Sequence, residues 1–248
     1  MKLSLIGAGR LGKQLYRELI QCASIELVQW MNRPAQTPTT LEGVELVSEL
    51  NQLSAVDCYL IAIRDESIEQ VVSQLPQNSL VIHTSGATTL NSLSHGRKGV
   101  FYPIQSFSNE KDVNFDKLPI AIEASEVGDL TFLKQLTLDM GAQPISMDSN
   151  QRKTLHLAAV LVNNFTNHLF TQADLLCKKN DLSFDLLKPL IRETIAKLEE
   201  MSPEKAQTGP ALRADQKTLQ VHLDLIENKE LKALYKLLSH TITNHYTE

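Results

Sequence analysis

Cysteine is scarce in this chain, and the three that occur, Cys22, Cys58 and Cys177, are far apart in apolar stretches. This pattern excludes a disulfide framework, and we expect reduced, buried thiols in a cytoplasmic protein. The cysteines also show no zinc-binding spacing, so we expect no metal site. An excess of basic residues is also absent, since the net charge is -5 and the sequence pI is near 5.8. With no basic stripe along the chain, nucleic acid is not an expected partner.

Long apolar runs are missing as well. No stretch approaches the length of a membrane helix, and glycines at 7, 9 and 12 interrupt the region where a secretory signal would need a continuous apolar run. We therefore expect neither a membrane-embedded segment nor a membrane partner.

The most informative segment that is present lies at positions 2–12, where a short β-rich run passes through three spaced glycines into an amphipathic helical pattern. Gly7 would make the tight turn after the strand, Gly9 would let the backbone approach a pyrophosphate, and Gly12 would let the helix pack closely on the sheet. Leucines follow at four-residue intervals, so this helix has a core-facing stripe and its free N-terminal amides would point at the phosphates. The context predicts a dinucleotide site whose binding residues are Gly7, Ala8, Gly9, Arg10, Leu11 and Gly12.

The end of the second predicted strand indicates which dinucleotide binds. A carboxylate about 20 residues after the glycines would bind the ribose 2′-hydroxyl of NAD, but this chain has Asn32 and Arg33 there. A guanidinium can pair with the 2′-phosphate of NADP and stack on the adenine. We therefore expect both residues to bind cofactor, with NADP(H) favoured over NAD(H). The alternative is that Arg33 is a solvated loop residue.

Apolar, β-branched runs alternate with helical patterns up to about residue 148, and long helical patterns follow. This order is typical of an α/β fold, and we predict an N-terminal Rossmann dinucleotide-binding domain over 1–148 followed by an all-helical domain over 149–248. Within the second domain, a serine cap followed by proline predicts a helix start at Ser202. The predicted strands are 3–6, 26–31, 44–47, 58–63, 80–83, 100–102, 120–123 and 144–147, and helices are predicted at 67–75 and 127–140.

Polar residues follow the strands of the predicted sheet, at the edge where open parallel sheets bind ligands. Arg64 and Asp65 follow the fourth predicted strand and would line the cofactor, while Thr84 and Ser85 follow the fifth and would lie near the nicotinamide. The alternative for Asp65 and for Ser67 is a helix cap, since both residue types are preferred there.

Three further candidates lie at the ends of the fifth and sixth predicted strands. Tyr102 and Gln105 are expected to contact substrate. His83 is either a catalytic group or a strand-end histidine bonded to the backbone, because position alone does not decide the role of a histidine.

The helical domain contains a second group of polar residues, on the helix predicted over 150–178. At about 100° per residue, Asn163 and Asn167 fall within roughly 20° of His156, and Asn164 and His168 lie about 80° and 120° around the helix. An unpaired buried amide costs about 1–3 kcal/mol, so a ligand, a partner helix or water should satisfy this face, and exposure to solvent is the alternative. We assign substrate contacts to Asn163, Asn167 and His168.

A loop over 206–215 carries threonine, glycine and proline and is typical of a turn. It would carry Arg213 toward an anionic group of the substrate. The plainer alternative for its last residue, Asp215, is the cap of the next helix.

Five segments resemble those of a known family: GAGRLG at 7–12, HTSGA at 83–87, YPIQSF at 102–107, HLAAVLVNNFTNHL at 156–169 and TGPALRAD at 208–215. Over nearly its whole length the chain resembles Rossmann-like proteins with a C-terminal DUF2520 domain, within the wider group of 6-phosphogluconate dehydrogenase-like and pyrroline-5-carboxylate reductase-like reductases. The resemblance implies an NADP-type Rossmann domain and a helical domain, like the C-terminal domain of 6-phosphogluconate dehydrogenase, that dimerises.

The β-hydroxyacid dehydrogenases of that wider group place a catalytic lysine one helical turn before an asparagine, but Ala159 and Val160 occupy the matching positions here. Hydride transfer to a carbonyl or imine needs a proton donor within hydrogen-bond reach. We assign that role to His156, with Asn164 as orienting donor, and His83 or Tyr102 as second choices.

These observations favour an NADP(H)-dependent oxidoreductase that transfers hydride to or from a small carbonyl or imine compound. One alternative is an enzyme that uses a deazaflavin partner, and the other is a non-catalytic NADP(H)-binding redox sensor or regulatory protein. A homodimer through the helical domain is expected, because the leucines and isoleucine of 223–238 offer more apolar surface than a small helical domain buries alone.

Overall fold

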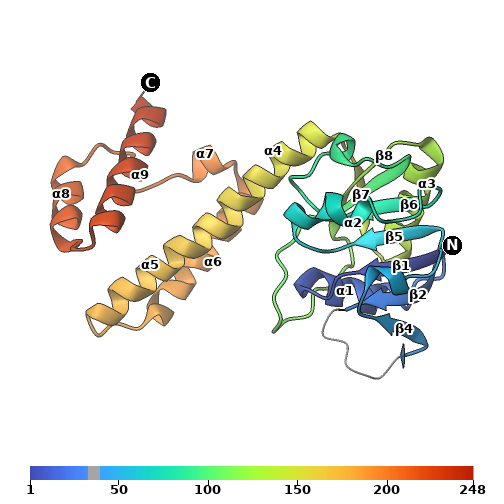
Figure 1. Ribbon diagram of the computed structural model, residues 1–248. Helices are drawn as coiled ribbons and strands as arrows, with labels where there is room; N and C mark the ends of the chain where they lie inside the picture. The colour runs from blue at the N-terminus through green and yellow to red at the C-terminus, as the bar shows by residue number, and fades with distance from the viewer. Residues whose placement is uncertain (33–39, 248) are drawn as a thin grey trace. The chain divides into compact units, whose positions relative to one another are not determined.

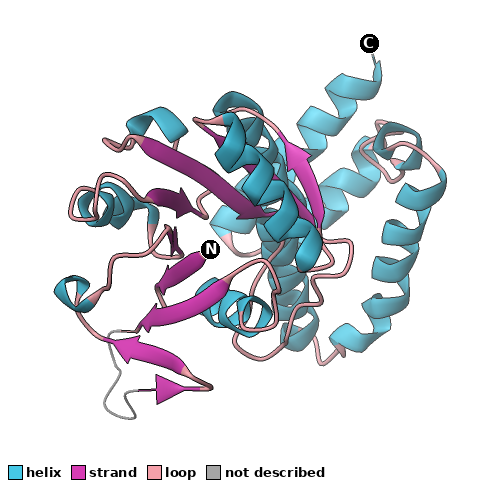
Figure 2. Ribbon diagram, turned by 90° about the vertical axis from the view of Figure 1, so that its right-hand side faces the viewer, coloured by secondary structure: helices cyan, strands magenta, loops and turns pink. Residues whose placement is uncertain are grey.

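The computed structural model describes residues 1–32 and 40–247. The chain forms two compact units, Met1–Asn164 and Phe165–Glu248. The first is α/β and the second is helical (Figures 1 and 2). The predicted division into domains over 1–148 and 149–248 stays a prediction.

The strands of the first unit form one sheet in the order β3-β4-β2-β1-β5-β6-β7-β8-β9. Their bounds are β1 (Lys2–Ile6), β2 (Glu26–Met31), β3 (Thr40–Leu41), β4 (Val44–Val47), β5 (Cys58–Ile61), β6 (Leu80–His83), β7 (Arg97–Pro103), β8 (Pro119–Ala124) and β9 (Gln143–Ser146). Every predicted strand is present, and the short edge strand β3 was not predicted.

The sheet is mixed, and its central strands are parallel. From β4 through β2, β1, β5 and β6 to β7 all pairs are parallel, whereas β3 is antiparallel to β4 and β8 is antiparallel to β7. The carboxyl ends of β1, β5, β6 and β7 therefore meet at one edge of the sheet. This edge brings the polar residues that follow these strands into one region.

Helices cover both faces of the sheet. Alternate strand residues point to opposite sides, so Leu3 and Leu5 pack with residues of α1 (Arg10–Leu19) and α3 (Val127–Asp139), while Ile6 packs with residues of α2 (Ile68–Val72). Two apolar cores result, one on each side of β1. This layered arrangement is a Rossmann fold, as predicted.

The helix predicted over 150–178 is present but is not regular. It consists of α4 (Ser149–Ala159), a π-helical segment Val160–Phe165 and α5 (Thr166–Lys179). Each residue of a π segment turns through less than the α-helical angle. The predicted angles between His156 and the asparagines assumed α geometry throughout and were therefore wrong.

The second unit continues with α6 (Lys188–Glu200), α7 (Pro203–Ala206), α8 (Gln216–Leu225) and α9 (Lys229–Thr247). The helix start at Ser202 is confirmed, since its side chain accepts a hydrogen bond from the Lys205 amide at the start of α7, although the helix is only one turn long. Asp215 caps α8 by accepting from the Thr218 amide, which confirms the plainer alternative for that residue.

The second unit has almost no core of its own. Among its described residues, only Ala211, Leu219 and Ile226 are buried apolar residues. Large apolar side chains are instead exposed on α5, α6, α8 and α9, among them Leu175 (55%), Leu190 (62%) and Leu225 (72%). None of the helices within 1–32 and 40–247 has the length and apolarity needed to cross a bilayer.

Candidate functional site

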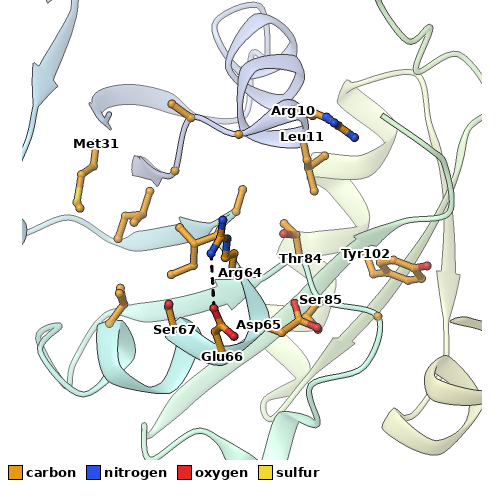
Figure 3. A pocket seen from close by; sticks show the side chains of 18 of the residues that line it. Arg10, Leu11, Met31, Arg64, Asp65, Glu66, Ser67, Thr84, Ser85 and Tyr102 are labelled. Carbon is orange, nitrogen blue, oxygen red and sulfur yellow. Dashed lines mark hydrogen bonds and ion pairs between the residues drawn. The ribbon is translucent and has the colours of Figure 1, made fainter. Parts of the chain in front are cut away.

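A cavity of about 760 Å³ lies in the first unit at the carboxyl edge of the sheet. Its lining comes from the turn after β1, from the segments after β2, β5 and β6, from Tyr102 near the end of β7 and from His156 of α4. Met31 and Ser67 lie toward one end and Tyr102 toward the other, with Thr84 and Ser85 between them (Figure 3). The cavity therefore brings together predicted residues from six separate sequence segments.

The glycine-rich turn is built so that two of its positions accept no side chain. Gly7 has φ +112°, and an added Cβ would lie 2.2 Å from the Ala62 carbonyl oxygen. A Cβ on Gly12 would lie 2.3 Å from the Gly7 carbonyl oxygen, because α1 packs directly on the turn. A Cβ on Gly9 would meet nothing within 4 Å, and Gly9 lines the cavity. The turn thus presents bare backbone to the cavity at Gly9.

The N-terminus of α1 fits a bound anion. Gly9 is the N-cap residue of α1, and no side chain forms a capping hydrogen bond there. The first turn of the helix contains no acidic residue. The free amides and the positive end of the helix dipole are therefore available where the cavity begins. At the end of β2, the Asn32 side-chain oxygen is buried, lines the cavity and has no hydrogen-bond partner within the described chain. Bare amides and an unsatisfied polar atom are what a dinucleotide would pair with.

Two hydrogen bonds with residues of β2 hold the glycine-rich turn in place. The Gly7 amide donates to the Met31 carbonyl at 3.0 Å, and the indole Nε1 of Trp30 donates to the Gly7 carbonyl at 2.9 Å. Trp30 in turn stacks on Tyr16 of α1, with ring centroids 4.4 Å apart. The strand β2 therefore holds the turn in its open shape.

The segment after β5 is linked to the segment after β6 across the cavity floor. The Ser85 hydroxyl donates to the Asp65 carboxylate at 2.7 Å and accepts from the amides of Ala87 and Thr88 at 3.1 and 2.9 Å. Neither Asp65 nor Ser67 caps its helix through its side chain. Arg64 is exposed and makes a long ion pair with Glu66 at 3.8 Å.

Tyr102 and His156 form a hydrogen-bonded pair at one end of the cavity. The Tyr102 hydroxyl lies 3.0 Å from His156 Nδ1, and the two rings meet edge to face. Partial burial raises the pKa of the Tyr102 phenol above its ordinary value, with the Asp65 charge acting in the same direction and Arg152 against it. Tyr102 is therefore protonated at neutral pH and can act as a proton donor.

Gly86 makes room for this pair. A Cβ at Gly86 would lie 2.6 Å from His156 Nδ1 and 2.9 Å from Tyr102 Cζ. Both atoms belong to rings that the hydrogen bond holds together. Any side chain at this position would therefore force the two rings apart.

One turn before His156 on α4, Arg152 anchors the helix to the sheet. Its side chain is fully buried, pairs with Glu123 of β8 and donates to the Thr88 carbonyl. Ser149 joins the same cluster, since its hydroxyl donates to Glu123 at 2.9 Å. Arg152 therefore fixes both α4 and the segment that carries Ser85 and Gly86.

His83, a predicted catalytic residue, is fully buried and does not line the cavity. Its Nδ1 accepts from the Ser85 amide at 3.2 Å, and its Nε2 has no partner among the described residues. Burial, followed by the Arg152 charge, lowers the pKa of His83 to about 3. This hydrogen bond agrees with the alternative interpretation, in which His83 is a strand-end histidine bonded to the backbone.

A second cavity, of about 360 Å³, shares Arg10, Tyr102 and His156 with the first. Three further predicted residues line it, namely Gln105 after β7 and Asn163 and Asn164 of the π segment. All of these belong to the first unit.

The other predicted substrate residues line neither cavity. Asn167 and His168 are exposed on α5, and Arg213 is exposed before α8. Arg33, predicted to select NADP, lies outside the described residues. The assignments of all four stay predictions.

Sequence reasoning missed Gly86, Arg152 and Glu123. Gly86 stands within the HTSGA segment at 83–87, so that motif contained a signal that was not used. Arg152 and Glu123 are 29 residues apart and carry no shared pattern. Their pairing follows only from the fold.

Residues 118–242 match the family described as a domain of unknown function, DUF2520. A crystal structure of a candidate NADP oxidoreductase from Bacteroides fragilis is similar to the chain, with a TM-score of 0.84, 35% identity and 98% of each chain covered. No curated protein sequence matches the chain.

Two more distant structures share the fold. A reductive aminase from Aspergillus terreus, in complex with NADPH4, cyclohexanone and allyl amine, has a TM-score of 0.71 at 15% identity, covering 98% of this chain and 94% of its own. An imine reductase from Myxococcus stipitatus, in complex with NADP+, has a TM-score of 0.65 at 14% identity, covering 98% and 92%. At these identities the likeness concerns the fold.

Proposed function

The chain belongs to the DUF2520 family, and we propose that it is an NADP(H)-dependent oxidoreductase acting on a C=N or C=O bond of a small molecule. One observation carries the proposal: the Tyr102–His156 hydrogen bond lies at one end of the same cavity that begins at the glycine-rich turn. A bound nicotinamide dinucleotide would supply the hydride. The residues of the chain would supply binding, orientation and a proton.

The described residues fit a dinucleotide. The free amides of α1 and the bare backbone at Gly9 would hold the pyrophosphate, and the unsatisfied oxygen of Asn32 would meet the adenosine half. Thr84 and Ser85 would lie beside the nicotinamide. The cavity of about 760 Å³ is within the size of cofactor sites.

NADP(H) is the proposed cofactor rather than NAD(H), because an amide and a guanidinium stand at the sequence position where a carboxylate would repel a phosphate. Arg33→Glu tests this preference. We expect it to weaken NADPH binding far more than NADH binding in calorimetric titrations. Equal losses for the two cofactors would contradict the assignment.

Tyr102 is the proposed proton donor, and His156 the residue that orients it. When the Tyr102 O–H points to the substrate, its oxygen can accept from a proton on His156 Nδ1, which stabilises the phenolate as it forms. The raised pKa keeps the phenol protonated before the reaction. Tyr102 then gives a proton to the substrate nitrogen or oxygen while the neighbouring carbon receives the hydride.

Loss of NADPH absorbance with a panel of imines, oxo acids and aldehydes tests this role. We expect Tyr102→Phe and His156→Ala to lower kcat by about 10²–10⁴-fold, with NADPH affinity nearly unchanged by calorimetry. Lys153→Ala is the matched control, an exposed residue of the same helix that lines neither cavity. NADPH binding without turnover of any substrate, in the unmodified protein, would favour a sensor or regulator instead.

A homodimer through the helical unit is part of the proposal. With only three buried apolar residues among its described residues, that unit cannot form a stable core alone. Its exposed leucines would be covered by the same surface of a second copy.

The thiols support a cytoplasmic location. Burial raises the pKa of Cys22 to about 11 and that of Cys58 to about 12, so both are unreactive. No disulfide links the cysteines.

A further inference from the structure

The second cavity has a charge that distinguishes it from the first. Arg10 is the lining residue with a permanent positive charge, and no aspartate or glutamate lines this cavity in the described structure. The first cavity, by contrast, is also lined by Arg64, Asp65 and Glu66. A space with a cation and no carboxylate favours an anionic ligand.

Arg10 is available to such a ligand. Its side chain is exposed, and no ion pair within the described residues engages it. It projects from the first turn of α1 on the same side of the cofactor cavity as Tyr102 (Figure 3). Arg10 and the Tyr102 hydroxyl therefore face the space that the two cavities share.

The remaining lining of the second cavity includes amide and apolar side chains. The π segment places the neighbouring residues Asn163 and Asn164 on one cavity wall, and Gln105 comes from the segment after β7. Ile104 and Phe107 provide apolar surface. The volume of about 360 Å³ suits a small molecule with a short hydrocarbon body and polar groups at one side.

We propose that the second cavity binds a substrate that carries a carboxylate next to its reacting C=N or C=O group, that is, a 2-imino or 2-oxo acid. Arg10 would take the carboxylate in a charge-assisted, bidentate pair. The reacting atom would then lie toward Tyr102. The inference rests on the proposed function, since hydride from NADPH goes to the carbon and a proton from Tyr102 to the nitrogen or oxygen, while the carboxylate is unchanged.

Arg10 has one competing role, because it also lines the cofactor cavity and could pair with the cofactor phosphates. The two roles predict different ligand preferences. If Arg10 binds the substrate carboxylate, its loss changes the discrimination between an anion and its neutral analogue. If it serves only the phosphates, its loss changes NADP+ affinity and leaves that discrimination unaltered.

Calorimetric titration of the NADP+-saturated protein distinguishes the two roles of Arg10 without requiring turnover. The probes are cyclopentanecarboxylate and cyclopentanecarboxamide, which share a shape and differ in charge. We expect the carboxylate to bind about tenfold more tightly or better. Arg10→Gln should remove this preference, and Arg10→Lys should keep part of it. Lys13→Gln is the matched control and should keep it, because Lys13 is an exposed cation of the same helix that lines neither cavity.

A preference that Arg10→Gln leaves intact, or equal or absent binding of both probes, would overturn the inference. In a second arm, kcat/KM for 1-pyrroline-2-carboxylate should exceed that for 2-methyl-1-pyrroline, and Arg10→Gln should remove most of this advantage. Carboxylate binding that depends on Arg10, without turnover of either imine, would support the subsite and count against the proposed reaction. Absence of NADP(H) binding would count against the proposed function itself.

Discussion

The two units of this chain use apolar residues in opposite ways. In Met1–Asn164 most apolar side chains of the strands and of α1, α2 and α3 are buried in two cores, and several are fully inaccessible. In Phe165–Glu248 most large apolar side chains are exposed. The first unit is therefore stabilised by its own packing, whereas the second needs a surface to cover it.

This difference indicates where substitutions should act. Positions in the first unit are constrained by steric contacts and by a buried ion pair, so we expect losses of folding stability there. Positions on the helices of the second unit are open in the single chain, so we expect changes of assembly instead. Each prediction below tests one side of this contrast.

The largest effect is expected for Gly7→Ala. The new Cβ would lie 2.2 Å from the Ala62 carbonyl at a φ of +112°, so we expect the free energy of unfolding to fall by more than about 4 kcal/mol. Chemical denaturation measures this. Gly9→Ala is the matched control, expected to lose less than about 1 kcal/mol because its Cβ meets nothing within 4 Å, yet to weaken NADPH binding. Similar stability losses for both variants would contradict the geometry of the turn.

Arg152→Met should have the next largest effect. It leaves the mostly buried Glu123 carboxylate without its guanidinium partner, which costs about 3–5 kcal/mol in folding stability. The double variant Glu123→Gln with Arg152→Met removes both charges and should recover a measurable part of that loss. If the double variant were less stable than Arg152→Met alone, the charge would not be the source of the effect.

Leu190→Asp tests the second unit. Leu190 is 62% exposed on α6, so the single chain should fold, while a dimer that buries this leucine should weaken by about 100-fold or more (~3 kcal/mol). Sedimentation over a concentration series gives the association constant. Leu138→Asp on α3, 55% exposed in the first unit, is the control. An unchanged dimer in both variants would place the interface away from α6.

The smallest effect concerns the pH dependence of stability through His83. The folded-state pKa of about 3 lies below the ordinary value of 6.5. Above about pH 6.5 the imidazole is neutral in both the folded and the unfolded chain, so its titration does not reduce the free energy of unfolding there. As the pH falls below that value, the unfolded chain takes up a proton that the folded chain does not, and stability is lost until about pH 3.

His83→Gln should therefore reduce the slope of unfolding free energy against pH by about 1.4 kcal/mol per pH unit between pH 6 and pH 4. Denaturation series for both proteins across this range supply the measurement. Parallel slopes would show that His83 is not buried as a neutral group.

Much of the first unit could be predicted because its signals are local. The buried strands are short, mainly apolar runs, and the glycine-rich turn follows its strand directly. The edge strand Thr40–Leu41 was missed because two residues show no alternation. The antiparallel direction of β8 was missed because strand patterns do not encode direction.

The candidate site was predicted only in part, for a similar reason. Gly9 follows β1 and Tyr102 lies near the end of β7, and the ends of these strands meet in any sheet of this type, so their sequence positions indicate their location. The π segment Val160–Phe165 depends on a shift of backbone hydrogen bonds that apolar periodicity does not reveal. Arg152 has no distinguishing signal in the sequence, and only the packing of α4 on β8 makes it a buried partner of Glu123.

The contact between Trp30 and the glycine-rich turn gives the protein an optical probe of its own. Trp30 is the single tryptophan of the chain, and its indole N–H is bonded to the Gly7 carbonyl. Light absorbed by this ring can be passed to a reduced nicotinamide nearby, so quenching of its emission would report occupancy of the turn without any label. A variant that empties the turn would lose that signal while its folded spectrum remained.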